Sequence, residues 1–561
     1  MRGPFCLLLT LASAQPSPPC SSIPPSAPWI DCVLPLLPTY GPLGATGVTF
    51  TTSDAPLQSL FAHAEAKEAA NAALLAPGFP VLVEGAGYGN VWLETQPMGG
   101  ASYGLRNLTL ALNNQLVFVR TQRGDGRLAG MITRGSGGVV HPTFSYPGNA
   151  NHSMLQGFYM ASPAVDVSFL LGATGTAPPL VAAYLLELQA ALARFEGWLW
   201  AARNSSSGVL WLADTADTGE DGSDKYRPLP SNPIAGPFLS MDMMGYAHDA
   251  QRALARIAAL QGDAAQASRW AGRAAATAAA LRAGLWREEL GACFDRERDG
   301  AQRYVSSLLH NNLRAMWAGA FDQGMADAFV AQHLMNRSQF WTPTPLPSIA
   351  ASDPRFQNVP GNNWGGPAEG LTFQRAIRAL SAYGHHAEVL LLGAAQRAAL
   401  APTVKFPQQI NPLTSIPDAG DGYGPMILSL LEYTALYSGV ALRYEPPALL
   451  FSGFGGEAFV YEQRLGGSAW RAEGFGNGTF VGTLNGARLF ACTGRARVVV
   501  GMDGAVAGLV GASSAAAAVA LLLPGSSAAP LQLQLEPNTE WTVSGSAPPV
   551  LARRVPFTPP Y

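Results

Sequence analysis

Hydrophobic residues recur at helical spacing over most of residues 52–438. Between positions 181 and 203, for example, apolar side chains return every three or four positions and so share one face of an α-helix; they are Tyr184, Leu188, Leu192, Phe195 and Leu199. The same pattern predicts helices, mostly in pairs, at 59–75, 107–122, 181–203, 248–260, 263–285, 306–320, 323–333, 370–383, 386–399 and 423–437.

Long Gly/Pro-rich loops separate these helices and argue against a regular solenoid. A tetratricopeptide-like array repeats at a fixed period with short turns, whereas here the period is irregular and several loops exceed roughly twenty residues. Long ordered loops in a compact domain usually carry function. The pattern therefore favours a mainly α domain, a closed double ring of helices of the (α/α)6 toroid type, whose loops gather at one mouth.

The pattern changes near Pro446 and Pro447 to short β-type runs with Gly or Asn turns between most of them. These runs lie at 449–451, 458–463, 479–484, 488–493, 497–502, 517–523 and 531–535, and such closely spaced strands predict a β-sandwich. The predicted organisation is a signal peptide at 1–14, a Pro/Ser-rich arm at 15–50, the helical domain at 51–442 and the β-sandwich domain at 443–561.

The first residues have the features of a secretory signal peptide. Arg2 supplies the positive start, residues 7–11 a short apolar run, and residues 12–14 (Ala-Ser-Ala) a cleavage site. Later apolar runs are too short for a membrane helix, which needs about 18 residues. Five glycosylation sequons agree with secretion; they begin at Asn107, Asn151, Asn204, Asn336 and Asn477. We expect a glycoprotein that is secreted or resides in an endomembrane lumen.

The cysteines and the composition narrow the chemistry. Cys20 and Cys32 are close enough in the arm to form a disulfide in an oxidising compartment, and Cys293 and Cys492 are expected to be free core thiols.

Of the residues, 48% are hydrophobic, 13% are charged and the net charge is −3. Without a basic field, nucleic acid is not an expected partner. Neither a metal nor a cofactor is expected, because the histidines are scattered and no phosphate or dinucleotide motif occurs in a strand–helix context. The oligomeric state is left open.

Asp221 is the first candidate catalytic residue. Gly219 and Gly222 let the backbone turn tightly around it, and Glu220 and Asp224 are expected to crowd it with negative charge. A nearby carboxylate raises the pKa of an acid, and a general acid must hold its proton near the working pH. The alternatives are a solvated acidic turn or a calcium loop. The calcium loop fails, because an EF-hand needs Glu at its twelfth position and counting from Asp217 places Pro228 there.

Glu369 is the second candidate. It follows the loop that contains Asn363 and Trp364 and stands just before the helix predicted at 370–383. A helix N-terminus stabilises a carboxylate, so we expect Glu369 to stay ionised and to be competent as a base. An aromatic face such as that of Trp364 suits a sugar ring. The alternative is an ordinary acid at the start of a helix.

Further residues are candidates for binding sugar hydroxyl groups. Two segments with neighbouring glycines, 92–97 and 122–127, combine acids with aromatic or bidentate groups. The alternative for the first is a core Trp beside a surface turn. The alternative for the second is a surface turn closed by an ion pair. The segment 406–414 is rich in amides, which bind hydroxyls but cannot act as bases. The substrate-binding candidates are Trp92, Glu94, Gln96, Arg123, Asp125, Lys225, Asn363, Trp364, Gln408, Gln409 and Tyr423.

These segments together resemble the helical-toroid glycoside hydrolases of family 63, and most closely their mannosylglycerate-hydrolase-like domain. Residues 218–223 resemble the family's Ser-Gly-x-Asp-Asp/Asn-Ser segment, and the resemblance implies that Asp221 is the general acid. Residues 363–367 resemble its Trp-Arg-Gly-Pro loop, and 286–295, 409–414 and 423–424 are similar to further family segments. The similarity covers roughly residues 55–440.

Two positions depart from the family pattern. Gln408 occupies the position of the family's catalytic base, and Gly365 replaces the Arg of the loop. The sequence therefore predicts an inverting glycosidase with Asp221 as acid and Glu369 as base, whose carboxyl groups lie roughly 6.5–9.5 Å apart. The alternatives are a carbohydrate-binding pseudoenzyme, favoured by Gln408, a polysaccharide lyase, disfavoured by the acidic loops, and a helical interaction scaffold.

Overall fold

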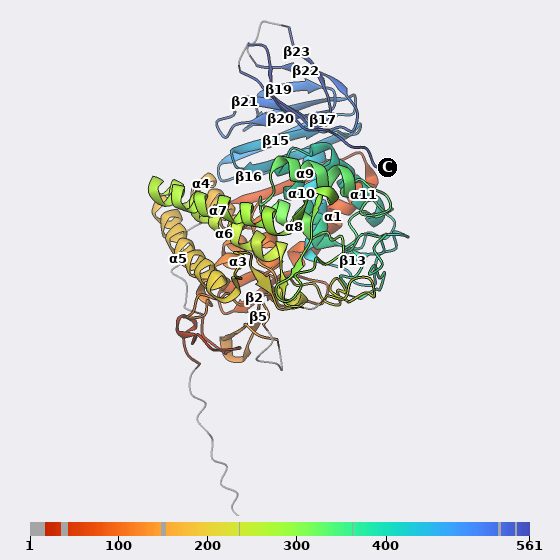
Figure 1. Ribbon diagram of the computed structural model, residues 1–561. Coiled ribbons are helices and arrows are strands. Elements are labelled where there is room, and N and C mark those ends of the chain that lie inside the picture. Colours follow the sequence, from red (N-terminus) through yellow and green to blue (C-terminus); the bar gives the residue numbers. More distant parts are fainter. Residues whose placement is uncertain are drawn as a thin grey trace, which may run out of the picture.

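The computed structural model describes residues 17–34, 43–146, 153–234, 236–361, 363–524, 529–544 and 547–561. The predicted signal peptide and the sequon at Asn151 lie outside these residues. In the described part of the chain a helical region is followed by a C-terminal region of two β-sheets, which stand at one end of the helices (Figure 1). No helix among the described residues is both long and apolar enough to cross a membrane.

The helices form a buried set and a peripheral set. α3, α4, α6, α8, α10 and α12 are buried on nearly every side, whereas α1, α5, α7 and α11 bury a single face. The bounds are α1 (Ala55–Ala70), α2 (Gln96–Tyr103), α3 (Leu108–Arg120), α4 (Ala161–Ala173), α5 (Pro178–Arg203), α6 (Met241–Leu260), α7 (Ala264–Leu285), α8 (Asn311–Trp317), α9 (Gln323–Phe329), α10 (Gly370–Ala382), α11 (His386–Leu400) and α12 (Gly424–Tyr437).

Helix ends follow ordinary capping chemistry. The side chain of Asp263 accepts a hydrogen bond from the Gln266 N–H (3.0 Å) and so caps the start of α7. Gly262, with φ +78°, ends the preceding turn, so the predicted boundary between α6 and α7 is confirmed. Short α2 and α4 were not predicted, because they are buried on nearly all sides and show no polar–apolar period.

Two antiparallel sheets make up the C-terminal region. One has the strand order β1-β16-β17-β18-β19-β22-β23 and the other β14-β15-β20-β21-β24-β25. The bounds are β14 (Ser438–Tyr444), β15 (Pro447–Gly453), β16 (Ala458–Leu465), β17 (Ser468–Phe475), β18 (Thr479–Leu484), β19 (Ala487–Thr493), β20 (Ala496–Val500), β21 (Val506–Gly511), β22 (Ala517–Leu522), β23 (Leu531–Leu535), β24 (Thr539–Thr542) and β25 (Val550–Arg554).

The N-terminal strand β1 (Thr46–Thr52) joins the first of these sheets. It pairs antiparallel with β16, and Phe50 packs on Phe61 of α1 and on Tyr461, with ring centroids 4.8 and 5.9 Å away. Most of this segment falls within the arm predicted at 15–50, which was expected to be irregular. Its strand forms because the alternating side chains bury Phe50 between a helix and a sheet.

The arm itself is tied to the helical region. The predicted disulfide between Cys20 and Cys32 is present, and Cys293 and Cys492 are free and buried, as expected. Cys32 and Trp29 make isolated bridges to the last short strand of the sheet β4 (Val91–Trp92), β5 (Met131–Arg134) and β6 (Val140–Thr143).

Candidate active site

The Asp221 loop turns sharply against a buried acid. Gly219 and Gly222 have φ of +73° and +65°, a region that favours glycine. A Cβ atom on Gly219 would lie 2.2 Å from Glu94 Oε2, so only glycine allows this close approach. Asp221 itself is partly exposed. The expected tight turn is therefore present, and it brings the Asp221 loop onto Glu94.

The two segments that the sequence singled out meet in space. The Trp364 N–H donates to the Asp221 carbonyl (3.0 Å). Beyond it, strand β12 (Ala368–Glu369) pairs with β13 (Gln409–Ile410), and the Gly370 N–H donates to the Gln408 carbonyl (2.9 Å). Acid loop, Glu369 and the amide-rich segment are thus parts of one site.

Four carboxyl groups interact electrostatically there: Glu84, Glu94, Asp221 and Glu369. Burial raises the pKa of Glu84 and of Glu369 well above the ordinary value, and in each case the charge of Glu94 is the next largest cause. Burial raises the pKa of Glu94 to about 8 although Arg375 and Arg314 lower it. The Asp221 charge raises all three.

Glu369 is the most deeply buried of these acids. Its side chain has no solvent exposure, and neither carboxyl oxygen has a hydrogen-bond partner among the described residues. The expectation that the N-terminus of α10 keeps it ionised is wrong, because desolvation and the neighbouring carboxylates outweigh the helix dipole. Glu369 therefore holds its proton to a higher pH than an ordinary glutamic acid.

Sequence reasoning missed Glu84 and Tyr88, which line the same site. The Tyr88 hydroxyl donates to Gln408 Oε1 (3.0 Å), and burial followed by the charges of the four acids raises its pKa to about 12. The Tyr423 hydroxyl donates to Glu84 Oε1 (3.0 Å). An acid and an aromatic residue flank Gly85, Ala86 and Gly87, all with positive φ. The acid and the aromatic residue on either side of two closely spaced glycines could have been recognised in the sequence.

Arg375 of α10 was also missed. Its guanidinium donates to the Glu94 carbonyl (3.2 Å), lies 3.7 Å from the Glu94 carboxylate and stacks over the Tyr159 ring. An arginine inside an amphipathic helix gives no sequence signal of this kind.

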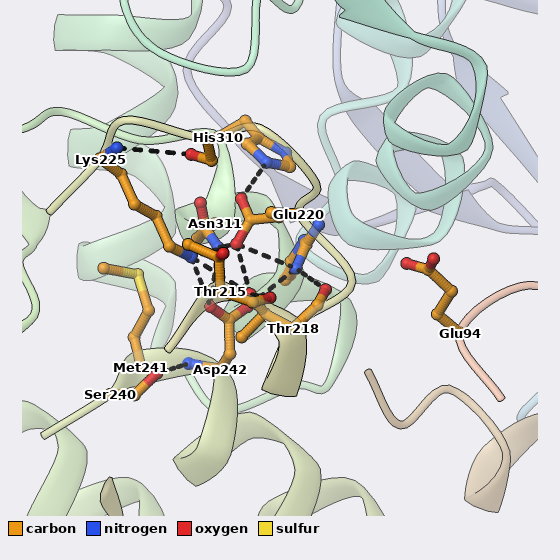
Figure 2. A network of polar contacts seen from close by, with 12 residues as sticks. Glu94, Thr215, Thr218, Glu220, Lys225, Ser240, Met241, Asp242, His310 and Asn311 are labelled. Carbon is orange, nitrogen blue, oxygen red and sulfur yellow. Dashed lines mark hydrogen bonds and ion pairs between the residues drawn. The ribbon is translucent and has the colours of Figure 1, made fainter. Parts of the chain in front are cut away.

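Lys225 and Glu220 point into the protein rather than toward a substrate. Both are fully buried and paired with each other, and Figure 2 shows His310 and Asn311 reaching the same Glu220 carboxylate, with Glu94 set apart from this network. Burial alone would raise the pKa of Glu220, but Lys225, Arg314 and His310 lower it well below the ordinary value. The expected crowding of Asp221 by Glu220 is therefore wrong, because that charge is already compensated.

Asp224 also has partners of its own. It lies 3.6 Å from Arg227 and accepts a hydrogen bond from Gln357.

Several predicted sugar contacts hold loops together instead. Trp364 is 2% exposed, and its ring stacks on His310 at a centroid distance of 5.3 Å. The buried Gln409 accepts from the Asn363 N–H (3.0 Å) and donates to the Val359 carbonyl (3.3 Å), and Asn363 Oδ1 accepts from the Gly365 N–H (2.7 Å). Trp364 therefore offers no open face to a sugar ring.

The segment at 92–96 is divided between the site and the scaffold. Gln96 Oε1 accepts from the Trp92 N–H (2.9 Å) at the start of α2, so this oxygen serves the backbone. Trp92 is partly buried, and only Glu94 is tied to the carboxyl cluster.

Arg123 and Asp125 close a surface turn with an ion pair, which was the alternative to a role in sugar binding. They are 2.7 Å apart, and Arg123 Nη1 donates to the Ala27 carbonyl of the arm (3.0 Å). None of their contacts among the described residues reaches the carboxyl cluster. Within the described ranges there is also no group of three or more His, Cys, Asp or Glu side chains placed to hold a metal ion.

Comparison with known proteins gives one family. The family model of the mannosylglycerate hydrolase MGH1-like glycoside hydrolase domain matches residues 98–424. Among curated proteins, no sequence matches this chain.

Three solved structures illustrate the similarity of fold. The GH63 mannosylglycerate hydrolase from Thermus thermophilus, in complex with glucose, is 18% identical with a TM-score of 0.53, over 66% of this chain and 99% of that one. A sialidase is 13% identical with a TM-score of 0.60, over 82% and 43%. The neutral trehalase from Saccharomyces cerevisiae is 13% identical with a TM-score of 0.51, over 64% and 74%. At these identities the likeness shows the fold: a GH63-like helical region, with a C-terminal region of many strands.

Proposed function

More than half of the chain matches one family model, so the chain belongs to the mannosylglycerate hydrolase MGH1-like glycoside hydrolases, and we propose that it cleaves its glycosidic bond with inversion. Its substrate is a carbohydrate. In this proposal Asp221 protonates the leaving oxygen, and Glu369 takes a proton from the water that attacks from the opposite face of the sugar.

The observation that carries the proposal is the pairing of these two acids across two joined loops. Asp221 is partly exposed and so can reach a glycosidic oxygen, whereas Glu369 is buried with two unpartnered oxygens. The Trp364 N–H holds the loop of one acid to the segment of the other. In this proposal the two carboxyl oxygens of Glu369, which have no hydrogen-bond partner among the described residues, accept the hydrogen bond of the attacking water.

Gln408 explains why the base lies elsewhere than in the resembling family. An amide accepts no proton at working pH, and its Oε1 already accepts from the Tyr88 hydroxyl. We assign it the orientation of the substrate or of the attacking water. Glu369 is on the segment hydrogen-bonded directly to Gln408, so a base at Glu369 serves the same side of the site.

The architecture fits this chemistry. We propose that the buried and peripheral helices close into an (α/α)6 toroid over residues 51–442, and that residues 443–561, with β1 added, form a β-sandwich that covers one end. The acids come from the loop after β3 (Phe79–Leu82), from the segment before α2, from the loop before α6 and from the N-terminus of α10. Such convergence of loops is expected at one mouth of a helical ring.

We further propose that the protein is secreted or resides in an endomembrane lumen. The signal-like start and the sequons support this, and so does the disulfide in the arm. Expression in a eukaryotic secretory host followed by N-terminal sequencing tests it: the mature chain should begin after Ala14 and carry glycans that a glycosidase treatment removes. An uncleaved, unglycosylated intracellular chain contradicts the proposal.

A screen of 4-nitrophenyl glycosides and disaccharides tests the function itself. On any accepted substrate, Asp221→Asn should lower kcat at least about 100-fold while leaving the unfolding temperature unchanged, because the amide fills the same volume but has no acidic proton to transfer to the leaving oxygen. Activity retained by Asp221→Asn contradicts the acid assignment. The alternative, a sugar-binding protein with little catalysis, is favoured by Gln408; sugar binding in calorimetry without product from the wild type would support it.

A further inference from the structure

His310 lies between the loop of Asp221 and the segment that carries Glu369. It directly precedes α8, its side chain is 1% exposed, and its backbone N–H donates to the Ser348 carbonyl (3.2 Å). The Ser348 N–H in turn donates to the carbonyls of Gly366 and Pro367, so the His310 backbone is attached to the segment that leads to Glu369. Figure 2 shows it meeting the Glu220 carboxylate.

On the acid side, His310 contacts the residue next to Asp221. Its Nε2 lies 3.1 Å from Glu220 Oε1. Glu220 is ionised, since Lys225 and Arg314 keep its pKa low against the effect of burial, and an ionised carboxylate can only accept. Nε2 must therefore carry the hydrogen and donate it.

On the other side, His310 contacts the structure that surrounds Glu369. Its Nδ1, an acceptor in this tautomer, lies 3.2 Å from Thr372 Oγ1 in the first turn of α10. Its ring stacks on Trp364 with an angle of 26° between the planes. Thr372 follows Glu369 by three residues and Trp364 precedes it by five, so the contacts bracket that acid.

The imidazole keeps this arrangement over a wide pH range. Burial, helped by the charges of Arg314 and Arg375, lowers the pKa of His310 to about 3 although Glu220 raises it. A second buried contact supports the same junction, because Arg314 Nη1 donates to the Thr218 carbonyl (3.0 Å) and its guanidinium lies over the Trp364 ring.

We propose that His310 is a positioning residue that sets the separation between the Asp221 and Glu369 carboxyl groups. The inference rests on the proposed function, in which these two acids act from opposite faces of the sugar. An inverting site needs room for one water between them, and a misplacement of about 1 Å can cost 100-fold in rate. The neutral His310 ring contacts Glu220 in the Asp221 loop and Thr372 in the Glu369 segment. A shift of either segment therefore breaks one of the contacts of His310.

Two variants and a matched control test the proposal, with the 4-nitrophenyl glycoside that the screen selects. His310→Phe keeps a ring against Trp364 but removes both hydrogen bonds. Thr372→Val removes only the hydroxyl from α10. Thr434→Val is the control, because Thr434 is equally buried in α12 and its hydroxyl donates only to its own helix at Leu430 (2.8 Å).

We expect kcat to fall about 30- to 100-fold in His310→Phe and about three- to tenfold in Thr372→Val, with KM within threefold, and to stay within twofold in Thr434→Val. The loss in His310→Phe should be smaller on the matching 2,4-dinitrophenyl glycoside, whose leaving group needs less help from an acid. A purely structural role lowers both rates equally.

The proposal is overturned if His310→Phe is folded and keeps kcat, or loses it equally on both leaving groups. If His310→Phe does not fold, Thr372→Val decides, and equality with Thr434→Val overturns the proposal. Asp221→Asn separates this outcome from failure of the function: an inactive Asp221→Asn beside fully active His310 and Thr372 variants refutes the positioning role alone.

Discussion

Glu369 is a carboxylic acid whose surroundings oppose its ionisation. No cation pairs with it among the described residues, and Glu94, Asp418, Glu84 and Asp221 all add to the effect of burial. A general base must be ionised to act, so the rate should be lost as the pH falls through this raised pKa. The acidic limb of kcat/KM should therefore lie at higher pH than the pKa of an ordinary glutamic acid, near 4.3, would place it.

Asp418→Asn should move that limb to lower pH. The Asp418 charge raises the pKa of Glu369, and Asn retains an oxygen for the Gly361 N–H (2.8 Å). We expect a downward shift of about 0.3–1 pH unit in a profile of kcat/KM. Asp503→Asn is the matched control, since Asp503 caps a turn of the C-terminal sheets and also accepts from a backbone N–H. A limb that does not move, or a raised pKa that limits the basic side instead, contradicts the base role of Glu369.

Residue types at the site were predictable, but the directions of their side chains were not. The flanking glycines correctly indicated a tight turn at Asp221. Trp364 and Lys225 were expected to face the substrate, yet both point inward, because His310 and Arg314 pack on Trp364 and Glu220 of the same loop pairs with Lys225. The partners of Trp364 come from a distant segment, which no local pattern encodes. Only Glu84 and Tyr88 were missed despite a local signal.

Among the elements, α7 shows how far local chemistry determines the fold. Its predicted range, 263–285, agrees with the structure; Asp263 caps its first turn, one face is buried and its outer face is exposed. The helix lies in the peripheral set, far in sequence from each acid of the site. Helices with a clear period could be predicted, whether peripheral or buried; α2 and α4, which show no such period, could not.

Asp263→Ala should destabilise the protein without changing the chemistry. Loss of the cap leaves the N–H of Gln266 without its partner and should cost about 1 kcal/mol of unfolding free energy. Urea denaturation measures the loss, and kcat at a temperature well below unfolding should be unchanged. Asp263→Asn, which retains the cap oxygen, is the control. A matching loss in the Asn variant would show that the cap hydrogen bond is not the cause.

In the molecule as a whole, strand β1 joins an N-terminal segment of the chain to the C-terminal sheets. It forms an edge of the seven-stranded sheet and continues into α1, so the helical region and the C-terminal sheets share one hydrophobic core. The sequence indicated a boundary near residue 443 but not this return of an N-terminal strand. Strand pairing over more than 400 residues, as between Thr46 and Leu465, depends on the whole fold.

Removal of β1 should therefore damage the whole protein. A chain starting at residue 54 lacks β1 and Phe50. Loss of this strand exposes the edge of β16 and leaves a cavity where the Phe50 ring packs on Phe61 and Tyr461. We expect a lower unfolding temperature and aggregation in size-exclusion chromatography. The control starts at residue 43 and retains β1. Equal behaviour of the two truncated chains contradicts the joining role of this strand.

The configuration of the sugar released by the enzyme distinguishes an inverting mechanism from a retaining one. Proton NMR during the first minutes of hydrolysis, before mutarotation, reports the configuration at the new hemiacetal carbon. We expect the inverted anomer from the wild type, and essentially no product from either Asp221→Asn or Glu369→Gln. Release of the anomer with retained configuration, or normal hydrolysis by either variant, would contradict the proposed mechanism.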